Sequence, residues 1–233
     1  MKTFLIQTIG GNIKHDFCFQ LIEAVNFINW YNGEKVYNVI LSDYINYREC
    51  IPVGSLEFVF DYIEKFFRKD RKSIKPINIP DELFIPKYLK RDCCIKDKKN
   101  IIIDRPVFIK SMDAYKSFTE IINDKNNIPE GRYLVSEVID IESEWRGFVL
   151  NGKLVGLNNY LGDFTLFPDI LLIKEMINSY KNCPPSYTID VGVNQSGTFI
   201  IEVHPFVSCG LYGFRGKFLP TMFNQAFNYI INN

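Results

Sequence analysis

The sequence has no excess of charge of either sign, because its 27 lysines and arginines are balanced by 27 aspartates and glutamates. Such a chain has no overall field that draws it to nucleic acid or to an anionic membrane, although a local basic cleft is compatible with it. No apolar stretch approaches the length of a membrane span, and the N-terminal residues lack the apolar segment of a secretory signal. We therefore expect a cytoplasmic protein with no membrane partner, and not a dedicated DNA or RNA binder.

Cysteine and histidine are few and lack the spacing of metal or redox motifs. The six cysteines are scattered, apart from the adjacent Cys93 and Cys94, and fit neither a zinc site nor a CxxC motif. The only histidines are His15 and His204, and their surroundings do not support a Ser-His-Asp or Cys-His nucleophile. The Walker A, GxSxG, HExxH and GxGxxG patterns are also absent. The sequence thus lacks the usual motifs of P-loop proteins, serine hydrolases, zinc proteases and dinucleotide-binding proteins.

The sequence does contain enough apolar residues to form a hydrophobic core. Of its 233 residues, 47% are hydrophobic and 15% are aromatic, which suits one medium domain or two small ones. The first part has the order strand, helix, strand, helix, and ends in a basic run. These elements are predicted at residues 3–9, 15–30, 37–41 and 55–67, with the basic run at 68–72.

A stretch rich in proline and lysine, residues 73–100, follows without a clear period and predicts a boundary. We place an α/β N-terminal subdomain at residues 1–88 and a second domain at 89–233. The second domain is expected to be rich in antiparallel strands, so that the chain as a whole is an α+β protein. Its predicted elements are strands at 101–110, 133–139, 146–150 and 153–157, a helix at 113–123, a helix near Pro168, an acidic hairpin at 187–204 and a last helix at 219–231.

The acidic hairpin carries the clearest candidate site. If residues 195–197 form a three-residue loop, Asn194 lies opposite Thr198 and Asp190 lies opposite Glu202, with His204 on the same face. Two carboxylates opposed on one face repel each other unless a cation lies between them. This pattern predicts a site for Mg²⁺, which binds one or two carboxylates and completes its shell with water and phosphate. A solvated face with basic neighbours is the alternative, and a loop of another length would separate the two acids.

Four further residues are candidates for binding an anionic ligand. Lys110 ends a strand where it can reach a phosphate, and Lys116 lies just beyond, although an exposed strand-end lysine is the more common case. Glu137 ends an apolar strand and can accept hydrogen bonds from a sugar or purine, or be a simple surface residue. In the hairpin around Asn151 and Gly152, Arg146 is predicted to pair with Leu157 among apolar neighbours, where an arginine usually has an anionic partner.

Taken in this order, the strand lysine at 108–110, the strand at 135–139, the hairpin that begins at 145–146, and Asp190 with Glu202 and His204 resemble an ATP-grasp protein. The segments 51–58 and 208–213 further resemble a small ATP-grasp clade familiar from phages and bacteria. The resemblance covers essentially the whole chain. It implies a nucleotide held between two α+β subdomains, with magnesium bridging its phosphates.

The resemblance also implies roles for the candidate residues. Lys110, with Lys116 as a second charge, would contact phosphate; Glu137, Val138 and Ile139 would hold ribose and adenine; and Asp190 and Glu202 would bind the metal. Arg146 would stabilise the transferred phosphoryl group or bind an acidic substrate. The family usually has an asparagine where this chain has His204, a ligand that suits Mn²⁺ better than Mg²⁺ and that would otherwise bind substrate or weaken catalysis.

The implied reaction is the ATP-dependent joining of a carboxylate to an amine through an acyl phosphate, with Lys110 and Arg146 as catalytic residues. The acceptor would be a small molecule, a peptide or a protein terminus. A phosphotransferase that acts on a hydroxyl group, and a non-catalytic nucleotide-binding protein, are the alternatives. The sequence indicates neither the substrates nor the oligomeric state.

Overall fold

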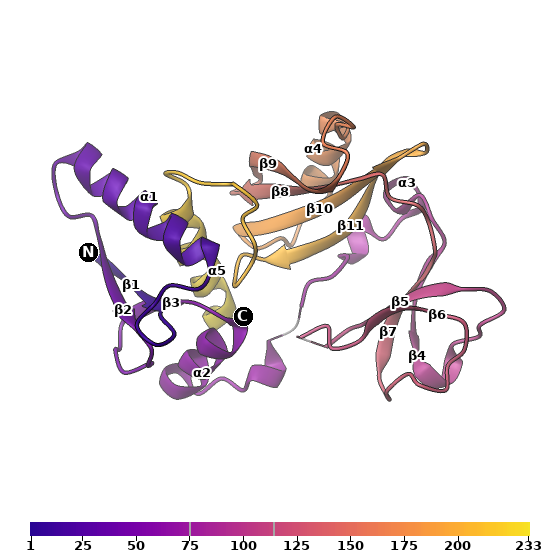
Figure 1. Ribbon diagram of the computed structural model, residues 1–233, viewed down its shortest axis with the longest axis horizontal. Coiled ribbons are helices and arrows are strands. Elements are labelled where there is room, and N and C mark those ends of the chain that lie inside the picture. The colour runs from indigo at the N-terminus through magenta and orange to yellow at the C-terminus, as the bar shows by residue number, and fades with distance from the viewer. Residues whose placement is uncertain (75, 114) are drawn as a thin grey trace.

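The computed structural model describes residues 1–74, 76–113 and 115–233, and in these residues the strands form three β-sheets. Figure 1 shows the sheets in a row, with the N-terminal sheet at one end, a small sheet at the other and the largest strands between them. The chain therefore has a mixed α+β architecture, as predicted.

The N-terminal sheet is parallel and has the strand order β2-β1-β3. Its strands are β1 (Lys2–Gln7), β2 (Tyr37–Ser42) and β3 (Cys50–Val53), and its helices are α1 (Asp16–Asn32) and α2 (Leu56–Phe67). The predicted order of strand, helix, strand and helix is confirmed. Helix α2 begins after Ser55, whose side-chain oxygen accepts a hydrogen bond from the backbone N–H of Phe58. Strand β3 was not predicted because it contains Pro52, which an edge strand tolerates.

The C-terminal helix α5 (Leu219–Asn232) returns to the N-terminal sheet, as Figure 1 shows. Its buried residues Leu219, Met222 and Phe223 belong to the same hydrophobic cluster as Leu5 and Leu21. The predicted division after residue 88 stays a prediction, but this cluster contains residues from both sides of it. We infer that the N-terminal sheet needs the C-terminal helix for its core.

The small sheet is antiparallel and has the order β4-β7-β5-β6. Its strands are β4 (Cys93–Asp97), β5 (Val107–Ser111), β6 (Thr119–Ile122) and β7 (Arg132–Glu137). The predicted strand at 133–139 is confirmed over most of its length. The strand predicted at 101–110 begins only at Val107, because the chain bends at residues 104–105 and Pro106 has no backbone N–H for strand pairing.

The helix predicted at 113–123 is wrong. The carboxylate of Asp113 accepts hydrogen bonds from the backbone N–H groups of Tyr115 and Ser117, which closes a turn instead of a helix. Strand β6 follows and pairs with β5. Ala114, inside the predicted helix, lies outside the described residues. Although its apolar residues have helical spacing, this segment therefore forms a turn and a strand that pairs with β5.

The central sheet is antiparallel, with the order β11-β10-β8-β9. Its strands are β8 (Ser143–Leu150), β9 (Lys153–Gly162), β10 (Ser186–Asn194) and β11 (Gly197–Pro205). Helix α4 (Ile170–Ser179) covers one face through Ile173, Met176 and Ile177, and the short helix α3 (Pro86–Leu89) packs against the β11 side. The opposite face, which helix α4 leaves open, carries polar residues such as Arg146 and Asp190, and also Phe148, which packs in the cluster that contains helix α5.

The hairpin between β8 and β9 has the predicted turn, in which Asn151 and Gly152 have φ values of 49° and 70°. Its register differs from the prediction by one residue, because an irregularity between Phe148 and Val149 leaves an extra residue on β9. Arg146 consequently lies opposite Asn158 and not Leu157.

The acidic hairpin contains two departures from the predicted register that cancel. Its loop has two residues and not three, so that Asn194 pairs with Gly197. A bulge between Asp190 and Val191 then leaves Ile201 on β11 without a partner. Beyond the bulge, Asp190 lies opposite Glu202, as predicted.

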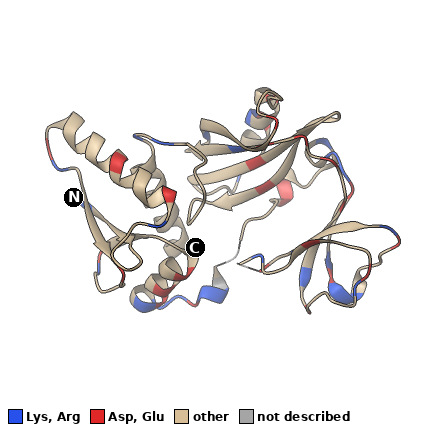
Figure 2. Cartoon of the chain, viewed as in Figure 1, with Lys and Arg blue, Asp and Glu red and all other residues tan. Residues whose placement is uncertain are grey.

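Charged residues lie on both the central sheet and the small sheet (Figure 2). Figure 2 shows acidic positions side by side on β10 and β11, and basic positions on the small sheet. In the described part of the chain, no helix is both long enough and apolar enough to cross a bilayer.

Candidate active site

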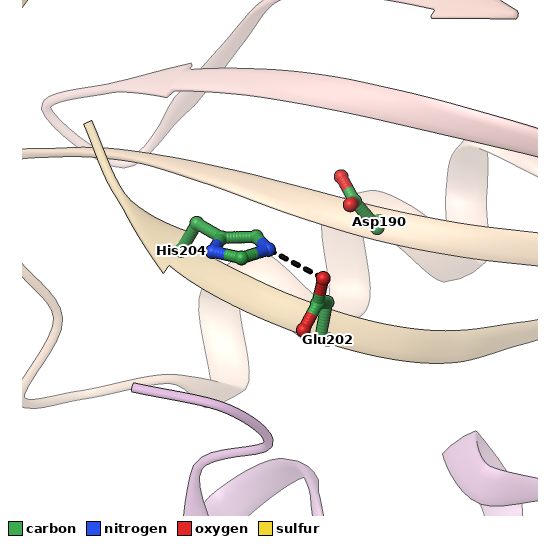
Figure 3. Close-up of side chains that lie close together, drawn as sticks. All are labelled: Asp190, Glu202 and His204. Atoms are coloured by element: carbon green, nitrogen blue, oxygen red, sulfur yellow. Dashed lines mark hydrogen bonds and ion pairs between the residues drawn. The ribbon is translucent and has the colours of Figure 1, made fainter. Parts of the chain in front are cut away.

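Three potential metal ligands converge on the open face of the central sheet. Asp190 comes from β10, and Glu202 and His204 come from β11 (Figure 3). Among the described residues, these three form the group whose ligand atoms all lie within 4.8 Å of one another. The antiparallel pairing produces this arrangement, since residue 202 is opposite residue 190 and residue 204 is two positions further along the same face.

Lys110 and Lys116 reach this group from the small sheet. Lys110, on β5, forms an ion pair with Glu202. Lys116 follows the Asp113 turn, and its Nζ lies 2.6 Å from Glu202 Oε2 and 2.9 Å from His204 Nε2. The structure thus brings together all five residues predicted for phosphate and metal binding.

The charges around Glu202 determine its protonation. Burial alone would raise its pKa, but the hydrogen bond with His204 and the charges of Lys110 and Lys116 lower the pKa well below its usual range. Burial lowers the pKa of His204 despite the adjacent carboxylate, so the imidazole is neutral at neutral pH. Burial also lowers the pKa of Lys116, to about 8. The group therefore offers an ionised carboxylate and a neutral nitrogen ligand beside two lysine side chains.

Arg146 contacts the candidate site by hydrogen bonding to Asp190. Its Nε and Nη2 donate to the two carboxylate oxygens of Asp190 at 2.8 and 2.7 Å, and its Nη1 donates to the carbonyl of Gly210 at 3.0 Å. The guanidinium also lies 5.0 Å from the centre of the Tyr212 ring, which stacks on Tyr160. Arg146 is 7% exposed and Asp190 is 2% exposed. This buried, bidentate pair fixes the orientation of the carboxylate that faces Glu202.

A pocket with mostly apolar walls lies between the small sheet and β11. Phe108, Val138, Ile139 and Ile201 provide apolar walls, while Lys110 and Glu137 are at its polar edge. No hydrogen bond involves the backbone of Val138 or Ile139 within the described ranges, so these peptide groups can pair with the edge of a flat ring. The residues predicted to hold ribose and adenine therefore line one pocket with the predicted phosphate-binding Lys110.

Two residues of this pocket were not predicted from the sequence. Arg91 donates to Ser136 Oγ at 3.0 Å and to the carbonyl of Ile200 at 2.8 Å, and the described residues include no carboxylate in ion-pair contact with it. Desolvation by burial lowers the pKa of Arg91. Ile201 is the bulge residue of β11. Arg91 had no recognisable pattern in the sequence, whereas the consecutive apolar residues Ile200 and Ile201 in an alternating strand are a visible trace of the bulge.

The segments 51–58 and 208–213, which were identified by resemblance, lie next to each other in the structure. Ser208 Oγ donates a hydrogen bond to the carbonyl of Gly54 at 2.5 Å. Gly54 cannot carry a side chain, because a Cβ there would lie 2.5 Å from two side-chain atoms of Gln7. The backbone of 208–213 also supplies the Gly210 carbonyl to Arg146. The two segments therefore connect the N-terminal subdomain to the candidate site.

The donor set fits a divalent cation of the Mg²⁺ or Mn²⁺ kind. Two carboxylates and one imidazole come from adjacent strands, and the imidazole makes the set softer than an all-oxygen site. The cysteines lie outside this group.

Solved structures share this fold at low sequence identity. A D-alanine–D-alanine ligase from Bacillus anthracis, crystallised with ATP, has a TM-score of 0.55 and 11% identity, covering 100% of this chain and 99% of that one. A RimK domain ATP-grasp protein from Sphaerobacter thermophilus has a TM-score of 0.52 and 15% identity, covering 99% and 98%. An N5-carboxyaminoimidazole synthetase from Staphylococcus aureus has a TM-score of 0.52 and 12% identity, covering 88% and 70%.

The sequence comparisons give the family. No curated protein sequence matches significantly. The family model for the ATP-grasp domain, R2K clade family 2, matches residues 88–218, which is more than half of the chain, and the chain therefore belongs to the ATP-grasp family.

Proposed function

We propose that this protein is an ATP-dependent carboxylate–amine ligase. The observation that carries the proposal is the convergence of two lysines from one sheet and a carboxylate–imidazole group from another beside a largely apolar pocket. The family to which the chain belongs supports ATP as the nucleotide, and the names of the ligase and synthetase with the same fold support a ligase reaction.

In this proposal the nucleotide lies between the small sheet and the central sheet. Val138 and Ile139 contact the adenine, and Glu137 accepts hydrogen bonds from the ribose. Lys110 contacts phosphate oxygens, Lys116 adds a second positive charge beside them, and Arg91 adds a further cation at the pocket. Lys110 suits this role because it lies both in the pocket and against Glu202.

Asp190, Glu202 and His204 would hold the metal ion, which supplies positive charge to the phosphate oxygens when bound. Arg146 orients the Asp190 carboxylate through two hydrogen bonds, and we propose this as its main contribution. The role assigned to it from the sequence, direct contact with the transferred phosphoryl group or with an acidic substrate, stays a prediction.

The proposed reaction has two steps. A carboxylate oxygen of the first substrate attacks the γ-phosphorus of ATP, and ADP leaves with the bridging oxygen. The amine of the second substrate then attacks the acyl carbon, phosphate leaves, and the ammonium loses its proton to solvent. The protein contributes position and charge neutralisation, which accounts for the absence of a candidate nucleophile in the sequence.

The test is release of ADP and phosphate with panels of carboxylates and amines. We expect release only when both classes are present, and its loss in Asp190→Asn and Glu202→Gln. Glu120→Gln, on the exposed edge strand β6, is the matched control and should retain turnover. Full turnover by the two site variants would refute the proposed site. Labelled phosphate retained on a hydroxyl product would show a phosphotransferase, and ATP binding without release under any condition would show a non-catalytic nucleotide-binding protein.

A further inference from the structure

A second pocket opens next to the candidate metal site, on the side of the N-terminal subdomain. Leu56 and Phe60 of helix α2 and Tyr115 form apolar walls, and Lys116, His204 and Ser208 lie at its polar end. Its volume is about 140 Å³. An apolar cavity of about 150 Å³ is known to accept benzene, so this pocket has room for an aromatic ring or a branched aliphatic group.

The polar end of the pocket favours an anion. Lys116 is the one charged side chain among the described residues that line it, and no carboxylate does so. An ammonium group has three N–H donors, and Glu202 and His204 are the partners that the described residues provide for Lys116. One donor of Lys116 thus remains for a ligand at this end.

The apolar walls have a defined geometry. The rings of Phe60 and Tyr115 are 6.1 Å apart at an interplanar angle of 74°, an edge-to-face arrangement. The hydrogen bond from Ser208 to Gly54 joins the loop after β11 to the start of helix α2 beside Leu56. The two segments that the nucleotide site does not use therefore bound this pocket.

We propose that this pocket holds the carboxylate substrate of the ligase, and that this substrate carries an aromatic or branched apolar group close to its carboxylate. The apolar group lies against Leu56, Phe60 and Tyr115, and the carboxylate points toward Lys116. Glu202 and His204 are within contact distance of Lys116, so the carboxylate is directed to the place where the phosphates and metal bind. This inference rests on the proposed function for the reaction, but the pocket itself can be tested without it.

Binding to the intact wild-type protein provides the first test. The probes are 3-phenylpropionate, 3-phenylpropylamine, which has the same ring with a cationic head, and succinate, which has carboxylates without a ring. Isothermal titration is expected to show binding of 3-phenylpropionate, at least about tenfold tighter than that of the other two. Equal binding of the amine or of succinate would overturn the proposal.

A matched pair of variants tests whether 3-phenylpropionate binds in this pocket. Leu56→Trp fills the pocket and is expected to weaken 3-phenylpropionate binding at least about tenfold, whereas Glu57→Trp places the same ring on the exposed side of the same helical turn and leaves binding unchanged. Unchanged ATP binding by both variants confirms that they are folded. Normal binding of 3-phenylpropionate to folded Leu56→Trp would overturn the assignment.

ADP release separates this inference from the proposed function. Panels of apolar and polar carboxylates are each supplied with a mixture of amines. Release with apolar carboxylates that is lost in Leu56→Trp supports both. Release with polar carboxylates alone keeps the ligase and overturns the pocket's specificity. Selective binding of 3-phenylpropionate that Leu56→Trp abolishes, without release for any acid, supports the pocket as an apolar carboxylate site and overturns the proposed reaction.

Discussion

Removing the guanidinium of Arg146 should destabilise the fold as well as the site. In Arg146→Met the carboxylate of Asp190, which is 2% exposed, loses both of its Arg146 hydrogen bonds and its counter-charge. Breaking a buried pair in this way typically costs about 3–5 kcal/mol of unfolding free energy. For a chain of this length that corresponds to a fall in melting temperature of roughly 6–20 °C.

The measurement is urea unfolding followed by both circular dichroism and tryptophan fluorescence, with coincident transitions as the condition for using a single free energy. Arg71→Met is the control, since Arg71 pairs with Glu64 where both side chains are about one-third exposed, and little change is expected. The double variant Arg146→Met, Asp190→Leu removes both buried charges and should recover much of the lost stability, because no unpaired charge remains.

Two outcomes would refute this reasoning. If Arg146→Met lost less than about 1 kcal/mol of unfolding free energy, its effect would be no larger than that of an ordinary surface substitution. Losses in Arg146→Met and in Asp190→Leu alone that simply add in the double variant would show that Arg146 and Asp190 do not depend on each other. In either case Asp190 would not owe its orientation to Arg146, and a direct role of Arg146 in phosphoryl transfer would become the better explanation.

The remaining predictions concern the metal group, the nucleotide pocket and a buried thiol. Glu202→Gln should weaken Mn²⁺ binding at least about tenfold, and His204→Asn should shift preference from Mn²⁺ toward Mg²⁺, both measured by metal titration; unchanged affinities would exclude these residues as ligands. Ile201→Glu should weaken binding of a fluorescent ATP analogue by placing a charge in the apolar wall, while binding equal to wild type would remove Ile201 from the pocket. Burial raises the pKa of the Cys209 thiol to about 12, so iodoacetamide at pH 8 should label it only after denaturation, as read by mass spectrometry. The unfolded state releases this proton first, so the contribution of Cys209 to stability is complete below pH 9 and is lost as the pH rises toward 12; a Cys209→Ala variant that shows the same alkaline loss as wild type would contradict this.

The elements that the sequence predicted well are those with local signals. The hairpin at Asn151 and Gly152 follows from turn chemistry, and helix α2 follows from Ser55 and the apolar period after it. The failures depend on distant partners. Strand β6 has the apolar spacing of a helix and is a strand because Asp113 closes a turn that returns the chain to β5. No local pattern could show this.

The candidate site divides in the same way. Lys110, Asp190 and Glu202 were predictable because strand alternation determines which side chains share a face. Arg91 was not, because it reaches the pocket through contacts with Ser136 and the Ile200 carbonyl, whose positions depend on how the two sheets pack. The sequence thus predicted which side chains of the candidate metal group meet, while the complete lining of the proposed nucleotide pocket required the tertiary structure.

The bulge in the acidic hairpin explains how one strand serves both parts of the site. In a regular strand Ile201 and Glu202 would point to opposite faces. With the bulge, Ile200 and Val203 both pack in the cluster beneath helix α4, while Ile201 lines the proposed nucleotide pocket and Glu202 joins the candidate metal group on the open face. A three-residue loop without a bulge would have kept Asp190 opposite Glu202 but turned Ile201 into the core. The pairing of Asp190 with Glu202 is therefore compatible with either register, whereas an apolar wall of the proposed nucleotide pocket directly beside the Glu202 carboxylate is obtained only with the shorter loop and the bulge.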